Sequence, residues 1–198
     1  MICKATETLK TNMVIACVSA MQAKPKIKLR PRFVCKDDSS GIHPRTFIMR
    51  WNPEISSHKI VDFEESMENF FERDFYYEWS VFDYQKVRVG DRFFMIKVGN
   101  GNTGVVMEGT IISYPFKDED WSGKGRDVRY VRMSPNCMVR QDNESGLLTT
   151  KALDEAIPGI DWNHGHSGVL LDDNKAKMLD ALWEEHLKAT IEHQKYDF

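Results

Sequence analysis

Short apolar segments separated by turn residues predict a set of β-strands. Four segments have this character, residues 46–51, 92–98, 104–113 and 127–133, and Gly, Asn, Asp or Pro stands close to the ends of each. Runs of this length with such boundaries are typical of strands. The loop between the second and third segments, residues 99–103, is rich in Gly and Asn, which favour tight hairpin turns. We therefore expect these two segments to form a β-hairpin.

Apolar residues with helical spacing predict helices around these strands. After the first strand, one apolar face is formed by Ile60, Phe63, Met67, Phe70 and Phe71. Asp62 and Glu65 have the spacing of a capping box for this helix. Near the C-terminus, a helix from about Asp172 has a buried stripe of Leu179, Leu182, Trp183, Leu187 and Ile191. This arrangement predicts an α+β fold, with a small, mostly antiparallel, curled sheet and helices around it.

The length of 198 residues suits one domain, and charge divides it into two regions. Residues 1–46 hold nine Lys or Arg and three Asp or Glu, whereas the whole chain has a net charge of -3. We expect a basic, partly flexible N-terminal extension, residues 1–45, and a domain with a C-terminal helix, residues 46–198. The net charge excludes a uniformly basic nucleic-acid binder. Any contact with nucleic acid must use a local patch or read bases more than phosphates.

Basic residues alternate with apolar residues or Pro between positions 24 and 33. In an extended chain these cations share one side, and the two prolines confine such a strand to the edge of a sheet. One interpretation is an arm that contacts phosphate groups through Lys26, Lys28, Arg30 and Arg32. The other interpretation is an edge strand whose cationic face is solvated and opposes aggregation.

Two motifs that suggest cofactor or metal binding have simpler explanations. Residues 99–104 match G-x-G-x-x-G, but a strand rather than a helix is expected after them, so they predict a hairpin loop and no dinucleotide. Asp161, His164 and His166 lie close together in the sequence, without the helical ligand spacing of common metal sites. We expect no cofactor and no metal.

The cysteines and the N-terminus bear on the cellular compartment. Cys3, Cys17, Cys35 and Cys137 include no C-x-x-C pair and are typical of reduced thiols, which predicts a cytoplasmic protein. The alternative is export, because an apolar run at residues 13–20 follows two lysines, as in a signal peptide. No apolar run reaches the roughly 20 residues of a membrane span, so we expect no membrane partner.

Tryptophans at the ends of predicted elements are candidates for a binding site. Trp51 ends a strand, Trp79 precedes a short helical turn expected at residues 83–87, and Trp121 lies in a charged loop. Indoles at a pocket mouth can stack on a planar base with about 1–3 kcal/mol. They can also enclose a methylated or cationic group. The alternative is that all of them are ordinary packing residues.

The order of several short motifs resembles the EVE branch of the PUA-like superfold, which is related to YTH domains. The similarity covers about residues 46–187, and it is carried by residues 47–53, 78–81, 90–95, 104–109, 127–131 and 165–168. The turn at residues 51–54 reads Trp-Asn-Pro-Glu, where EVE domains have a Lys-Ser-Glu-Pro-like turn. The resemblance implies a curled, mostly antiparallel, β-barrel-like sheet with peripheral helices. It also implies a pocket that holds one nucleobase, typically modified, turned out of its strand.

The resemblance also implies which residues line this pocket. Carried onto this sequence, the base-binding residues are Trp51, Asn52, Trp79, Ser80 and Trp121. Trp79 and Trp121 would stack on the base or enclose it. Asn52 would read a base edge, because its amide both donates and accepts hydrogen bonds. Ser80 would select an exocyclic group through its hydroxyl or backbone.

The resulting hypothesis is a non-enzymatic reader with no catalytic residue, whose partners are DNA or RNA with a modified base and an effector protein. Two alternatives remain open. The first is an amidohydrolase that acts on modified nucleosides, as in the related ASCH branch, with Lys97, Thr110 and Glu108 as its candidates. The second is a binding module for a protein or a small ligand, with a degenerate pocket.

Overall fold

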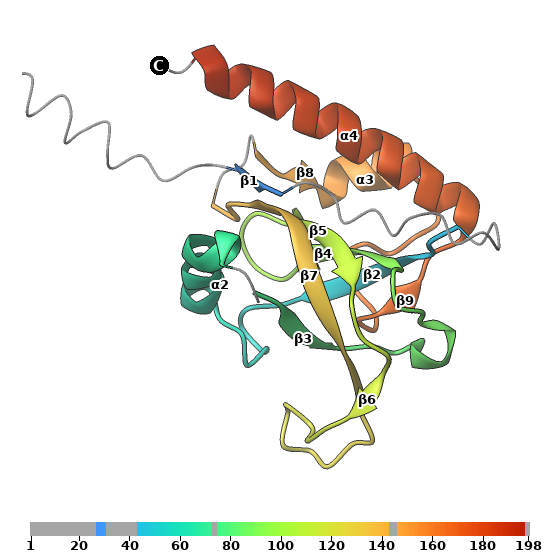
Figure 1. Cartoon of the computed structure of the whole chain (residues 1–198). Helices are drawn as coiled ribbons and strands as arrows, with labels where there is room; N and C mark the ends of the chain where they lie inside the picture. Colours follow the sequence, from blue (N-terminus) through green and yellow to red (C-terminus); the bar gives the residue numbers. More distant parts are fainter. Residues whose placement is uncertain (1–26, 31–42, 73–74, 143–145, 197–198) are drawn as a thin grey trace, which may run out of the picture.

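The computed structural model describes residues 27–30, 43–72, 75–142 and 146–196, and it is built around one mixed sheet (Figure 1). The strands are β1 (Ile27–Leu29), β2 (Thr46–Trp51), β3 (Tyr77–Ser80), β4 (Arg92–Lys97), β5 (Gly104–Ile111), β6 (Phe116–Lys117), β7 (Arg129–Val139), β8 (Leu148–Thr149) and β9 (Val169–Leu170). The helices are α2 (Ile60–Glu68), α3 (Thr150–Ala156) and α4 (Asp173–Tyr196), with short 3-10 turns η1 (Asn69–Phe71) and η2 (Tyr84–Lys86).

The sheet has the order β1-β7-β5-β4-β2-β9, with β3 and β6 also paired to β7 and β8 paired to β5. Only β2 and β4 run parallel among the described strand pairs, with Phe47 opposite Phe93. The α+β class and the curled, mostly antiparallel sheet are therefore confirmed. The hairpin of β4 and β5 is confirmed as well, and Gly99 in its loop has the positive φ of +91° that such turns require.

Bulges let the sheet curl over its core. The register shifts at residues 95–96 of β4 and at residues 108–109 of β5, and such shifts bend a strand. Gly109 has a packing reason to lack a side chain, because a Cβ atom there would lie 2.2 Å from the carbonyl oxygen of Ser134 on β7. A glycine at the bulge thus allows β5 and β7 to approach closely.

The core lies between the sheet and the helices, and it uses much of the predicted apolar face of each helix. Phe63 of α2 is fully buried and stacks on Trp51 of β2, with 4.8 Å between ring centroids. Trp183 of α4 is also fully buried and meets Phe94 of β4 edge to face at 6.0 Å. The helix α4 lies across one end of the molecule beside α3, whereas α2 covers another side (Figure 1).

Three details of the predicted helix at residues 60–71 are corrected. The N-cap residue is Lys59, and the side chain of Asp62, three residues later, accepts a hydrogen bond from the Lys59 backbone at 2.6 Å. Asp62 is therefore the second residue of the capping box, and the predicted pairing of Asp62 with Glu65 is wrong. Ile60 and Phe71 are exposed, with 39% and 65% of their surface accessible. The helix α2 ends at Glu68, and in the 3-10 turn that follows it Phe70 is fully buried while Phe71 points outward.

The strand β1 lies inside the predicted N-terminal extension, and it pairs with β7 at the end of the main strand order. The edge-strand interpretation is therefore confirmed for residues 27–29, but its cationic side is not freely solvated. Lys28 is only 8% exposed, and its ammonium group lies 3.9 Å from a carboxylate oxygen of Glu68. Arg30 donates to the backbone oxygen of Glu72 at 2.6 Å.

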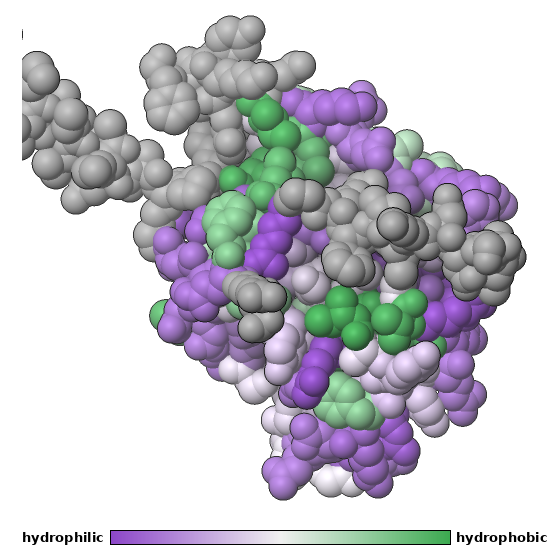
Figure 2. Space-filling view, viewed as in Figure 1, coloured by the Kyte–Doolittle hydropathy of each residue, from purple (hydrophilic) through white to green (hydrophobic). Residues whose placement is uncertain are grey.

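The surface seen in Figure 2 is mixed. Hydrophilic residues predominate in its coloured part, and apolar residues gather in several separate areas. Cys137 is buried and forms no disulfide bond within the described residues, and the other three cysteines lie outside them. None of the described helices combines the length and the apolar character of a bilayer span.

We predict that Trp183→Ala lowers the free energy of unfolding by about 3–5 kcal/mol, because it leaves a cavity between α4 and β4. Met178→Ala is the matched control on the same helix, since Met178 is 44% exposed, and it should change the free energy by less than about 0.5 kcal/mol. Denaturant unfolding of both variants tests this. Equal effects of the two variants would show that α4 is not held on the sheet through Trp183.

Candidate functional site

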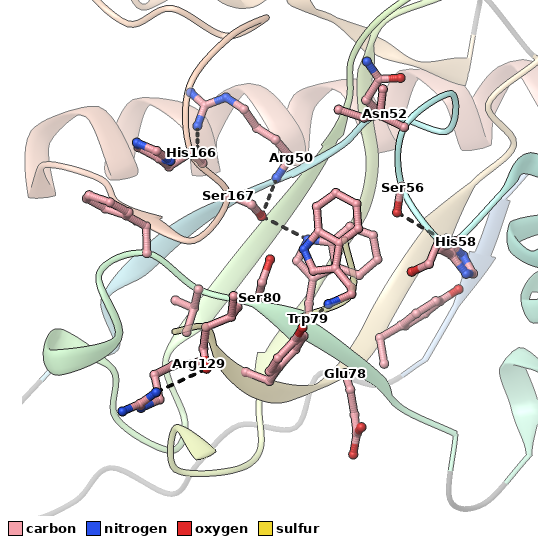
Figure 3. Close-up of a pocket in the computed structure, with 18 of the residues that line it drawn as sticks. Arg50, Asn52, Ser56, His58, Glu78, Trp79, Ser80, Arg129, His166 and Ser167 are labelled. Carbon is pink, nitrogen blue, oxygen red and sulfur yellow. Dashed lines mark hydrogen bonds between the residues drawn. The ribbon is translucent and has the colours of Figure 1, made fainter. Parts of the chain in front are cut away.

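A cavity of about 1020 Å³ opens between β3 and the end of β2, at the upper end of the usual size range of ligand sites. Four parts of the chain form most of its wall (Figure 3). They are the end of β2 with the following turn (residues 50–58), β3 with its flanking residues (75–84), the loop before β7 with the start of that strand (121–130) and a loop before β9 (163–167). Asp62 and Ser66 of α2 and Val98 after β4 complete the wall. These segments are distant in sequence, so only the folded sheet brings them together.

The indole of Trp79 is held in one orientation inside this cavity. Its Nε1–H group donates a hydrogen bond of 3.0 Å to Ser167 Oγ, and the backbone N–H of Arg50 donates a second bond of 3.0 Å to the same oxygen (Figure 3). One hydroxyl therefore connects β3, β2 and the loop before β9. A ring fixed in this way loses little conformational freedom when a planar ligand stacks on it.

Arg50 anchors the loop that carries Ser167. Its guanidinium donates to the carbonyl oxygens of His166 at 2.6 Å and Asp161 at 2.7 Å. Burial lowers the pKa of Arg50, and the charge of Asp161 opposes that shift. Gly168 completes the anchor: its backbone has a φ of +73°, and a Cβ atom would lie 2.4 Å from the Cα atom of Val81. The position of Ser167 is therefore set by its neighbours on both sides.

The side chain of His58 forms another part of the wall, and it faces aromatic rings. Its imidazole meets Tyr77 edge to face at 5.3 Å and Trp79 at 6.1 Å. Its Nε2 atom is buried and makes no hydrogen bond to any residue that the structure describes. Burial lowers the pKa of His58, with a smaller opposing effect from Asp62, so the neutral imidazole is favoured.

Of the predicted pocket residues, Asn52, Trp79, Ser80 and Trp121 all line this cavity. The prediction for Trp51 is corrected, because it is fully buried beneath the cavity wall and stacks on a core phenylalanine. Its Nε1–H group donates to the backbone oxygen of His58 at 2.8 Å, so Trp51 supports the wall without lining it. The Oδ1 atom of Asn52 accepts from the Glu54 backbone at 3.0 Å and stabilises the turn after β2.

Trp121 lies on the finger loop, residues 118–128 between β6 and β7, which projects at the lower end of Figure 1. Asp120 holds this loop, since its carboxylate accepts hydrogen bonds from Ser122 and from the backbone and side chain of Arg126. The Arg126 side chain holds the pKa of Asp120 well below its usual range. The Arg126 guanidinium also lies over the Trp121 ring, 5.5 Å from its centroid.

The two predicted phosphate contacts that the structure describes, Lys28 and Arg30, do not line the cavity. Lys28 and Arg30 contact the end of α2 and η1, whereas Lys26 and Arg32 lie outside the described residues. The prediction for Lys28 is corrected, because its buried ammonium group already has protein partners. Contact of Arg30 with phosphate stays a prediction.

The candidate residues for amidohydrolase chemistry and those for metal binding do not gather into one site. Lys97 pairs with Gly104 at one end of the β4–β5 hairpin, whereas Thr110 pairs with Arg92 at the other end. The Lys97 ammonium donates to the carbonyl oxygens of Asn100 and Asn102 in the hairpin loop. The imidazole Nδ1 of His164 lies 3.1 Å from an Asp161 carboxylate oxygen, and His166 instead stacks on Phe82. No metal-binding group of three such side chains occurs among the residues that the structure describes.

Three residues of the cavity wall, Arg50, His58 and Ser167, were not assigned a role from the sequence. A partial signal exists for Ser167, because it lies between Gly165 and Gly168, and both glycines have positive φ angles. Two glycines so close together indicate a loop whose backbone path is constrained. Nothing in the local sequence of Arg50 or His58 distinguishes them from other polar residues near a strand end.

No protein-family model matches the sequence, and no curated protein matches it. A hypothetical protein from Leishmania major has a similar fold, with 12% identity and a TM-score of 0.50, over 72% of this chain and 97% of that chain. Human THYN1 in complex with 5-methylcytosine-containing DNA gives 14% identity and a TM-score of 0.39, over 56% and 74% of the two chains. The YTH domain of Zygosaccharomyces rouxii MRB1 in complex with N6-methyladenosine RNA gives 14% identity and a TM-score of 0.43, over 77% of this chain and 89% of that chain.

We predict that His58 makes the protein less stable as the pH falls. Because its pKa is lower in the folded chain, the unfolded chain takes up a proton first as the pH falls through about 6.5, and this favours unfolding. His58→Gln lacks this loss, so its stability relative to wild type rises as the pH falls. Urea unfolding at several pH values measures the difference, with His164→Gln as the control for an exposed ring. A difference that does not change with pH would contradict the prediction.

We predict that Asp120→Ala loosens the finger loop without unfolding the domain. The variant loses every hydrogen bond to the carboxylate, while the loop adds little to the core. Amide hydrogen exchange at residues 121–127 should become faster, with exchange in β5 and β7 unchanged. Asp118→Ala is the matched control, because within the described residues the Asp118 carboxylate accepts only from the adjacent Glu119 backbone. Equal exchange in the two variants would show that Asp120 does not hold the loop.

Proposed function

We propose that this protein is a non-enzymatic reader that holds one modified nucleobase of DNA or RNA in the cavity beside Trp79. The observation that carries the proposal is the Trp79 indole, fixed by Ser167 within a cavity of about 1020 Å³. A flat apolar ring with polar groups at its border suits a ligand that is itself flat and has a polar edge. A nucleobase has both properties, since every base has a π-face and a distinct pattern of donors and acceptors.

The energetics support a base that has left its strand. Turning a base out costs a few kcal/mol, and the cost is least in single strands or at damaged or mispaired positions. Stacking of the base on Trp79 contributes about 1–3 kcal/mol of favourable free energy, which offsets this cost. Hydrogen bonds to the base edge from groups such as the Asn52 amide add to this, because Asn52 uses its oxygen in the turn and its nitrogen makes no hydrogen bond within the described part of the chain.

The charge of the protein supports recognition through the base rather than the backbone. The net charge is -3, and the arginines at the cavity are partly used in the protein, with Arg126 bound to Asp120 and Arg129 bound to Asp127. Few phosphate contacts imply a shallow dependence of affinity on salt, because the slope follows the number of neutralised phosphates. Selectivity then rests on the cavity, and an effector protein would act on what the cavity selects.

We predict that Trp79→Ala weakens binding of the preferred oligonucleotide by about 5- to 150-fold, the equivalent of one lost base stack. The measurement is fluorescence anisotropy at low salt with short labelled single strands, either plain or carrying 5-methylcytosine, 5-hydroxymethylcytosine or N6-methyladenine. Trp79→Phe keeps a stacking surface and should lose less.

The matched control is Tyr114→Ala, which removes an aromatic ring that is 76% exposed and lies outside the cavity wall. Circular dichroism confirms that each variant remains folded. Unchanged affinity in Trp79→Ala would contradict the cavity as the site. Failure of every oligonucleotide to bind the wild type at low salt would reject the reader function itself.

A further inference from the structure

The hydroxyl group of Ser167 has a hydrogen-bonding role that its neighbours determine. A hydroxyl oxygen can accept two hydrogen bonds and donate one. Both acceptor positions of Ser167 Oγ are taken, one by the Trp79 Nε1–H group and one by the Arg50 backbone N–H group, each at 3.0 Å (Figure 3). Both partners are pure donors, because neither an indole N–H nor a backbone N–H can accept.

The hydroxyl hydrogen is the part of Ser167 that remains available. No described residue accepts a hydrogen bond from Ser167 Oγ, although the residue lies in the cavity wall. The Cβ atom and the two incoming hydrogens occupy three of the four directions around the oxygen, so the hydroxyl hydrogen has one direction left. Reversing this arrangement would leave the indole or the Arg50 backbone N–H unpaired, which is costly for a buried donor.

We propose that Ser167 is a specificity-determining residue that acts only as a hydrogen-bond donor toward the bound base. It selects a base with an acceptor, a ring nitrogen or a carbonyl oxygen, at the border of the Trp79 ring, and it disfavours an amino group at that position. An amino group would place two donors against each other and leave both unsatisfied. This inference rests on the proposed function and adds the chemistry of the edge that is read.

Two other polar groups of the cavity wall, on His58 and Asn52, are less restricted in polarity. The imidazole of His58 can place its proton on either ring nitrogen, so it can match a donor or an acceptor. The side-chain amide of Asn52 offers both kinds of group. Ser167 differs from these two groups, because hydrogen bonds from within the folded chain restrict it to one polarity. Its position is also rigid, because Arg50 and Gly168 anchor the loop on both sides.

The first test combines variants with base analogues. The best-binding modified oligonucleotide is compared with versions in which single ring nitrogens or carbonyl groups of that base are replaced by C–H. For one such analogue, wild type should lose about tenfold or more in affinity, whereas Ser167→Ala should lose nothing further. Ser57→Ala is the control, since Ser57 lines the same cavity outside this network. Equal losses for every analogue in wild type and Ser167→Ala would overturn the inference.

Trp79→Phe provides a second variant that keeps the stacking ring. It removes the indole N–H, so Ser167 Oγ regains a free acceptor position and its hydroxyl can turn. For each protein, the affinity of the parent base is divided by that of an analogue with an amino group in place of the selected acceptor. This ratio should be about tenfold smaller for Trp79→Phe than for wild type. Unchanged discrimination would show that the indole does not set the polarity of Ser167, and it would overturn the inference.

A fragment experiment separates this inference from the reader function. Ligand-observed NMR compares pyrimidine, which only accepts hydrogen bonds, with benzene and aniline, for wild type and Ser167→Ala. Preference of wild type for pyrimidine, lost in Ser167→Ala, would support the donor role even if no oligonucleotide binds, in which case only the reader function fails. Oligonucleotide binding without that preference would overturn the donor role and leave the reader function standing. Absence of binding in both experiments would overturn both.

Discussion

The cavity depends on hydrogen bonds that converge on one oxygen, Ser167 Oγ. Its two donors belong to residues 88 and 117 positions away in the sequence, Trp79 on β3 and Arg50 on β2. Backbone bonds of 2.9 Å from Phe82 N–H to the Ser167 oxygen and from Gly168 N–H to the Ile48 oxygen join the same segments beside them. The bonds to Ser167 Oγ add the orientation of the indole, because they fix its Nε1–H group on the loop before β9.

The sheet determines where these three segments can meet. β2 lies between β4 and β9, so the loop that leads into β9 passes along the end of β2. β3 reaches the same region by pairing with the long strand β7, with Trp79 opposite Val131. The cavity therefore opens where two branches of one sheet approach each other. Side chains held by such a frame are better preorganised than side chains on an isolated loop.

Many cationic groups of the chain are used within the protein. Lys28 lies beside Glu68, Arg45 pairs with Asp91 at 3.1 Å, and Arg92 pairs with Glu108 at 3.1 Å. Charges that are satisfied internally contribute little to the attraction of a polyanion. The same holds for the finger loop, where Arg126 lies over the Trp121 ring and pairs with Asp120 at 2.9 Å. The cavity wall therefore offers shape and hydrogen-bonding groups more than free positive charge.

Local pattern determined much of the fold and part of the site. Short apolar segments bounded by turn residues predicted β2 and the β4–β5 hairpin, and apolar residues with helical spacing predicted α4. These elements are predictable because the period of an amphipathic strand or helix appears directly in the order of apolar and polar residues. They also marked Trp79 and Trp121 as aromatic residues at element ends. Only the tertiary structure decided that Trp51 is buried and that Arg50, His58 and Ser167 join the wall. The reason is that burial and hydrogen-bond partners depend on how separate segments pack in space, as in the Arg50–Ser167 bond across 117 positions.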